Sequence, residues 1–174
     1  TETPLEAIAE EMSRFDSVCA IVNLRRHARV LVAALEQLCP ENTVFFLTTD
    51  LCPAHRSRQI ERIRQRLAKG LSCRVVATQC IEAGVDLDFG RMYRALAPLE
   101  AIIQAAGRCN RNGRGSLGQV VVFRPEDSRM PPPVHFHTLQ GIEQFPVVGQ
   151  NLSGSPSEIL PSGEIRLSCR GEYH

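Results

Sequence analysis

Short apolar runs alternate with amphipathic stretches along the first 123 residues of the chain. Each run is continuous and does not alternate apolar with polar positions, which is typical of a strand buried on both faces of a sheet. We therefore expect strands at residues 18–22, 43–47, 73–77, 92–96 and 119–123.

Three helices are expected between these strands, because apolar residues recur there at helical spacing. They cover residues 25–38, 55–69 and about 98–106. In the second of these helices, Arg58, Arg62 and Arg66 lie on the face opposite Ile63. We expect this basic face to be solvated, and tracking of nucleic-acid phosphates is the less favoured interpretation.

This alternation predicts an α/β domain with a parallel sheet and helices on both faces. In such sheets, ligands bind beyond the carboxyl ends of the strands. Polar residues follow three of the expected strands, at Asn23, Thr48 and Thr78–Gln79. Short polar side chains at strand ends suit contacts to a sugar-phosphate backbone, although strand termination explains each of them taken alone. We expect the functional surface at this edge.

The character of the chain changes after the last expected strand. Residues 130–133 are rich in proline and residues 149–156 in glycine and serine. We expect one domain at residues 15–126, followed at 127–174 by an irregular linker or tail. Residues 1–14 are interpreted as a linker or an N-terminal helix. Because the chain begins with Thr1, we expect it to be part of a longer protein.

Composition narrows the possible functions. The net charge of +1 argues against a generally basic nucleic-acid coat, and the absence of Trp argues against aromatic base-stacking platforms. Seven cysteines without a C-x-x-C pair argue against a disulfide framework and a zinc site, so we expect no metal site and a reducing cytoplasm. No apolar run reaches membrane-spanning length, which predicts no membrane partner.

Two short sequence runs contain residues that are suited to binding a nucleotide. Arg108 and Arg111 stand three apart after the last expected helix, and guanidinium groups match phosphate oxygens. For two arginines alone, a solvated basic loop is the more common role. Gly84 and Asp86 follow a strand, where the acid would accept from a ribose hydroxyl or cap a structural turn. The chain contains no G-x-x-x-x-G-K-[ST] loop, so it holds only half of a nucleotide-hydrolysing site.

Four motifs occur in order along the chain. They are N-L-R-R at 23–26, L-C-P-A-H-R at 51–56, T-Q-C-I-E-A-G-V-D at 78–86 and Q-A-A-G-R-C-N-R at 104–111. In this order they resemble the second RecA-like domain of superfamily two helicases, and the closest resemblance is to the helicase part of the type I CRISPR-associated helicase-nuclease. The resemblance covers about residues 15–126. It implies a RecA-like three-layer sandwich with a mostly parallel central sheet.

The resemblance also implies an ATP site in a cleft between two RecA-like domains. Arg111 would be the arginine finger on the γ-phosphate, Arg108 would support it, and Gln104 would lie beside it. ATP and Mg²⁺ would be held mainly by the first RecA-like domain, which this chain lacks. The residues that would approach the nucleotide are Gly84, Asp86 and Gly107.

A track for single-stranded DNA is implied as well. The residues expected to face its backbone are Thr78, Gln79, Thr48 and Asn23. The implied partners are the first RecA-like domain and a nuclease domain of the same full-length protein, together with a CRISPR surveillance complex. The expected function is that of a motor domain of an ATP-dependent DNA translocase or helicase in antiviral defence, inactive as an isolated chain.

Two alternatives stay open at this point. One is the second RecA-like domain of another superfamily two helicase that acts on RNA or in DNA repair. The other is a catalytically silent RecA-like module that retains the fold for interactions.

Overall fold

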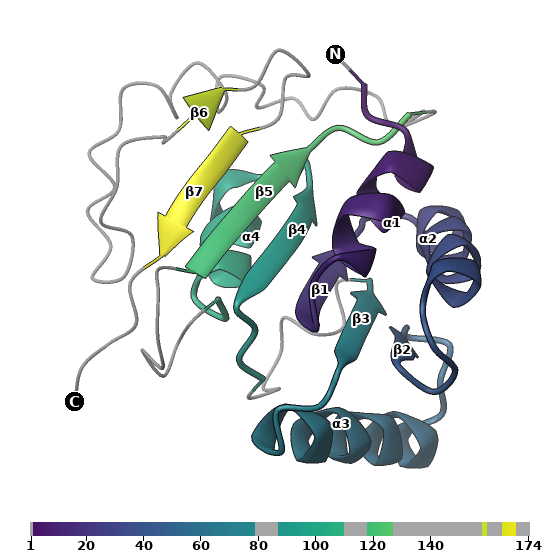
Figure 1. The fold of residues 1–174 in the computed structure, drawn as a ribbon. Coiled ribbons are helices and arrows are strands. Elements are labelled where there is room, and N and C mark those ends of the chain that lie inside the picture. The colour runs from purple at the N-terminus through teal and green to yellow at the C-terminus, as the bar shows by residue number, and fades with distance from the viewer. Residues whose placement is uncertain (1, 79–86, 110–117, 127–157, 160–164, 170–174) are drawn as a thin grey trace, which may run out of the picture.

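The computed structural model describes residues 2–78, 87–109, 118–126, 158–159 and 165–169 (Figure 1). The helices of this part are α1 (Leu5–Ser13), α2 (Arg25–Leu38), α3 (Pro53–Ala68) and α4 (Leu99–Ala106). Its strands are β1 (Ser17–Ile21), β2 (Val44–Leu47), β3 (Cys73–Ala77), β4 (Arg91–Ala95), β5 (Gly118–Phe123), β6 (Glu158–Ile159) and β7 (Ile165–Cys169).

The sheet has the strand order β2-β3-β1-β4-β5-β7-β6, and β1 to β5 run parallel. The predicted α/β architecture with a mostly parallel sheet is therefore confirmed. Each of the five strands and three helices expected from the apolar pattern is present within about two residues of its predicted bounds.

Both faces of the sheet are buried, which explains the continuous apolar runs. Along β1, Cys19 and Ile21 pack in one core cluster with residues of α3 and α4. Val18 and Ala20 point to the other face, into a cluster with residues of α1 and α2. Two helices thus cover each face and make a three-layer sandwich (Figure 1).

The first residues of the chain form α1, which is part of this core. Leu5, Ile8, Ala9 and Met12 are buried at the spacing of one helix face. Thr3 is bound to the end of the β5 region, since its N–H donates to the Arg124 carbonyl at 2.7 Å. The packed domain therefore begins before residue 15. Residue 15 is the start that the sequence pattern predicted.

Part of the segment expected as a linker or tail joins the sheet. Strand β7 pairs antiparallel with β5, and β6 pairs antiparallel with β7. The free backbone groups of β5 provide an edge for such pairing. The alternation of Ile165, Leu167 and Cys169 with polar residues was the signal for β7, and the surrounding proline- and glycine-rich stretches obscured it.

Arg91 anchors α1 to the sheet. Its Nη2 lies 2.8 Å from Glu11 Oε1 in α1, and its Nε donates to the Tyr93 hydroxyl at 3.0 Å. The guanidinium also stacks over the Phe15 ring at 4.3 Å from the centroid. Arg166 of β7 reaches the same Glu11 oxygen at 3.5 Å. One partly buried ion-pair network therefore ties the helix α1 to strands β4 and β7.

We expect Arg91→Met to lower the free energy of unfolding by about 1–3 kcal/mol. The substitution leaves the partly buried carboxylate of Glu11 with only the longer contact to Arg166, at 3.5 Å. Urea denaturation measures the loss. Arg64→Met is the matched control, since Arg64 forms an exposed pair with Glu61 and should cost about 0.5 kcal/mol or less. Equal losses for the two variants would contradict the anchoring role.

Candidate ATP and nucleic-acid site

The structure brings Thr48, Thr78 and Asn23 together at the carboxyl edge of the sheet. They follow β2, β3 and β1, which are neighbours in the sheet. The N–H of Thr78 donates to the Leu47 carbonyl at 3.1 Å, and the N–H of Val22 donates to the Ala77 carbonyl at 3.0 Å. The edge predicted from the polar strand ends therefore exists, and parallel pairing fixes the spacing of its residues.

The threonines of this edge are largely covered by the chain. Thr48 is 4% exposed and Thr78 is 6% exposed. The Thr48 hydroxyl accepts a long hydrogen bond of 3.4 Å from the N–H of Asp50. Asp50 forms an ion pair with Arg25 at the start of α2. This contact links the loop after β2 to the helix after β1 and leaves an exposed guanidinium at the edge.

Asn23 has a structural role that the sequence did not reveal. Its Nδ2 donates to the Leu96 carbonyl at 2.7 Å, and its Oδ1 accepts from Arg94 Nη1 at 2.7 Å. Arg94 is fully buried and also donates to the Ala95 carbonyl at 2.9 Å. A buried guanidinium needs such acceptors, because an unsatisfied charge in the interior is costly. The missed signal was an arginine inside an apolar strand.

The hydrogen bond from Arg94 to Asn23 should contribute to the stability of the folded chain. We expect Asn23→Ala to lower the free energy of unfolding by about 1–3 kcal/mol, because Arg94 loses an acceptor in the core. Asn23→Asp is the matched control, since it keeps an acceptor oxygen for Arg94. Both are measured by urea denaturation. If Asn23→Ala folds as stably as the wild-type chain, Asn23 is free to serve the nucleic acid alone.

Arg108 lies at the other end of the sheet. Its carbonyl accepts from the N–H of Phe89 at 3.3 Å, immediately before β4 begins. The neighbouring Cys109 is buried, with its Sγ 3.4 Å from the Gln119 carbonyl near the start of β5. Strands β4 and β5 thus hold Arg108 at the amino edge. Because α4 follows β4 and precedes the parallel strand β5, it runs back along the sheet, and Arg108 lies at the edge opposite Thr48 and Thr78. The expectation of one functional surface at the carboxyl edge stays a prediction.

The C-terminal end of α4 presents an open face beside Arg108. Ile102, Ala105 and Ala106 are buried, whereas Gln104 and Gly107 are exposed. Gly107 has a helical φ of −64°, and a Cβ there would meet only ordinary contacts of 3.6 Å. Neither backbone conformation nor packing requires glycine at this position. The absence of a side chain leaves room on the surface at this end of α4.

Four of the predicted site residues, Arg111, Gly84, Asp86 and Gln79, lie outside the described residues. The chain leaves the carboxyl edge at Thr78 and enters the core again at Leu87 and Phe89, which are 2% and 1% exposed. Phe89 is bonded to Arg108. Phe89, three residues after the motif at 78–86, therefore lies beside Arg108 at the amino edge.

The described residues include no group of three or more His, Cys, Asp or Glu side chains placed to hold a metal ion. In the same part of the chain, no helix has both the length and the apolar character to cross a lipid bilayer.

Comparison with known families decides the classification. The family of the CRISPR-associated nuclease/helicase Cas3, C-terminal, matches residues 14–114, which is more than half of the 174 residues. The chain belongs to this family. The Cas3 nuclease/helicase of Haloferax volcanii is 37% identical over 116 residues, covering 57% of this chain and 12% of that protein.

Solved structures show the same RecA-like fold. T. fusca Cas3 crystallised with ATP matches with a TM-score of 0.57 at 23% identity, covering 75% of this chain and 18% of that chain. The Mycobacterium smegmatis helicase Lhr, bound to single-stranded DNA and AMP-PNP, gives a TM-score of 0.52 at 23% identity over 70% of this chain and 16% of that one. This chain therefore spans less than a fifth of the Cas3 proteins to which it is similar.

Proposed function

We propose that the chain is the C-terminal motor domain of an ATP-dependent single-stranded DNA translocase or helicase in CRISPR antiviral defence. The observation that carries the proposal is the division of the Cas3-family motifs between two edges of one rigid sheet. Thr48 and Thr78 lie at the carboxyl edge, and Arg108 with the open end of α4 lies at the amino edge.

The amino edge fits the reacting end of a nucleotide. The half-buried residue Arg108 and the exposed Gln104 and Gly107 would provide donors and space for phosphate oxygens. Arg111 would stabilise the charge that develops on the transferring phosphoryl group, with Arg108 in support. Asp86 and Gly84 would approach the ribose. ATP with Mg²⁺ would be held mainly by another RecA-like domain, because this sequence has no phosphate-binding lysine loop.

The carboxyl edge fits a nucleic-acid backbone. Hydroxyl groups and backbone N–H groups position phosphates without reading sequence, as a motor that moves along any DNA requires. Thr48 and Thr78 would supply such groups, Gln79 would add to them, and Asn23 would hold the edge in place through Arg94. Arg25 lies at the same edge, where Asp50 neutralises its charge.

Coupling between the two edges follows from the sheet itself. Strand β3 carries Thr78 at its carboxyl end, and the chain then returns to Phe89 beside Arg108. A displacement of Arg108 towards a nucleotide in the partner domain would therefore move Thr78 as part of the same body. Closure and opening of the ATP cleft would shift the DNA contacts in step with hydrolysis.

The implied partners are proposals of the same kind. The first RecA-like domain and the nuclease domain would belong to the same full-length protein, in the cytoplasm, recruited by a CRISPR surveillance complex. An alternative function in RNA unwinding or DNA repair has support from the fold alone, through the similarity to Lhr. The Cas3 family match over residues 14–114 favours the CRISPR function over this alternative and over a silent interaction module.

We expect Arg111→Ala in the full-length protein to lower the DNA-stimulated kcat for ATP hydrolysis by ~10³–10⁵-fold, because the charge on the transferring phosphoryl loses its stabilising cation. The affinity for single-stranded DNA should stay within about twofold, because Arg111 is assigned to the ATP cleft and not to the track. Steady-state ATPase assays and oligonucleotide binding measure the two effects.

Arg29→Ala is the matched control, since Arg29 is exposed on α2, on the face of the sheet opposite α4. It should retain wild-type kcat. Equal ATPase rates for Arg111→Ala and the wild type would refute the finger role. A full-length protein without DNA-stimulated ATPase would instead favour the silent module.

A further inference from the structure

The outer face of α3 carries cations that the rest of the described chain leaves without a carboxylate partner. They are Arg58, Arg62, Arg66 and Lys69, which we call the α3 cations. Glu61 is the single acid between Pro53 and Lys69, and it is already engaged by Arg64 at 3.0 Å and by Gln65 at 2.9 Å. The helix therefore keeps a strong local positive charge, although the whole chain has a net charge of only +1.

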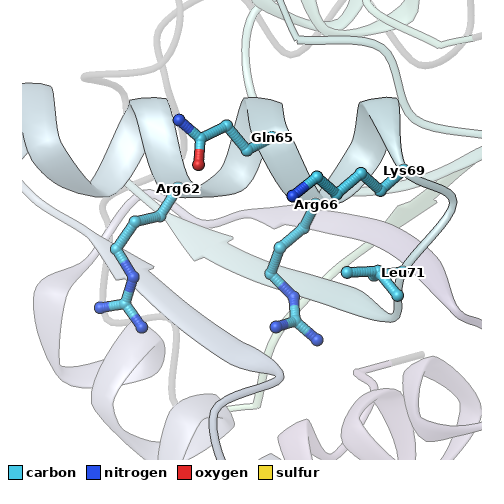
Figure 2. A pocket seen from close by; sticks show the side chains of 5 residues that line it. All are labelled: Arg62, Gln65, Arg66, Lys69 and Leu71. Carbon is cyan, nitrogen blue, oxygen red and sulfur yellow. The ribbon is translucent and has the colours of Figure 1, made fainter.

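Two of the α3 cations are held in fixed orientations. The guanidinium carbons of Arg62 and Arg66 lie 5.5 and 5.9 Å from the centroid of the Phe45 ring. Arg66 Nε also donates to the Ser72 carbonyl at 2.9 Å. Both side chains extend from α3 in the same direction (Figure 2). Cation–π contacts of this length pre-order the side chains and reduce the entropy that a ligand must remove.

These side chains border an open hollow of about 220 Å³. Its lining residues are Arg62, Gln65, Arg66, Lys69 and Leu71 (Figure 2). Leu71 is 47% exposed, so one apolar surface stands among several cations and an amide. This combination fits a charged phosphodiester next to an apolar sugar, which is the repeating chemistry of a nucleic-acid backbone.

The position of α3 relates this face to the carboxyl edge. The helix begins at Pro53, a few residues after Thr48 and the Asp50 loop. From Arg58 to Lys69 the α3 cations extend along the helix for about 16 Å, at a rise of 1.5 Å per residue. They therefore lead away from the edge where Thr48 and Thr78 lie, towards the amino end of β3.

We propose that the α3 cations form a second contact surface for the phosphate backbone of single-stranded DNA, continuous with the carboxyl-edge track. The proposal rests on the proposed function, because it takes the DNA at the carboxyl edge as given. The contact is electrostatic and independent of sequence. It replaces the simple solvated face expected from the sequence with one whose guanidinium groups are pre-ordered on Phe45.

The test is binding of fluorescent oligothymidylates to the full-length protein at increasing salt. Removal of one cation that neutralises a phosphate of a single strand reduces the slope of log K against log salt by ~0.7, so Arg62→Gln/Arg66→Gln should reduce it by about 1.4. Affinity at low salt should fall by about 10-fold. The effect should appear only with oligonucleotides long enough to extend from the carboxyl edge onto α3.

Arg64→Gln is the matched control on the same helix. It removes the same charge from a cation that Glu61 already neutralises, and it should change the slope by less than about 0.3. Lys69→Gln is a second probe that touches no packed ring, and it should reduce the slope by about 0.7 without loss of stability. Equal slopes for Arg64→Gln, Lys69→Gln and the double variant overturn the inference.

The ATPase of the same proteins separates this inference from the proposed function. At saturating DNA, the double variant should retain wild-type kcat and require more DNA for half-maximal stimulation. If the wild type shows DNA-stimulated ATPase and the α3 variants need the same DNA concentration for half-maximal stimulation, the inference is wrong and the motor function stands. If the wild type shows no DNA-stimulated ATPase, the proposed motor function itself is wrong.

Discussion

Burial of both faces of the parallel sheet is the constraint on which the rest of this domain depends. Strands β1, β3, β4 and β5 carry mainly apolar residues on each side, so they are stable only when helices cover both faces. Parallel pairing of these strands also requires crossover connections, in which each helix returns from the carboxyl edge to the amino edge. This return path determines where every polar segment of the chain emerges.

The two halves of the candidate site are a direct consequence. Residues directly after a strand, such as Thr48 and Thr78, emerge at the carboxyl edge, whereas Arg108 follows a helix and emerges at the amino edge. The edges are joined by a hydrogen-bonded and densely packed sheet, so we expect them to move as one body. In a two-domain motor this geometry would convert a small movement at the nucleotide into a displacement at the DNA.

The apolar pattern predicted the strands and helices up to residue 123 because each run had to satisfy burial on two faces. The same pattern implies the edge at which Arg108 emerges, because a helix between two parallel strands returns to the amino edge. The expectation of a single functional edge did not take this return into account. Asn23 was assigned to nucleic acid from its strand-end position, whereas its side-chain amide is hydrogen-bonded to Arg94 and to the Leu96 carbonyl.

Two further features could not be predicted from the sequence because their partners are distant in sequence. Strand β7 is short and surrounded by proline and glycine, so its apolar alternation is a weak signal until its pairing with β5 is seen. The α3 cations look like an ordinary solvated face until Phe45, from the neighbouring strand, is placed beneath two of them. Both depend on tertiary contacts that periodicity does not encode.

The central claim is that this chain is one half of a two-domain ATPase. Steady-state ATP hydrolysis with single-stranded DNA tests it most directly, comparing the 174-residue chain with the full-length protein that carries it. We expect only background ATP hydrolysis from the isolated chain and DNA-stimulated ATP hydrolysis from the full-length protein. Substantial DNA-stimulated turnover by the isolated chain would contradict it.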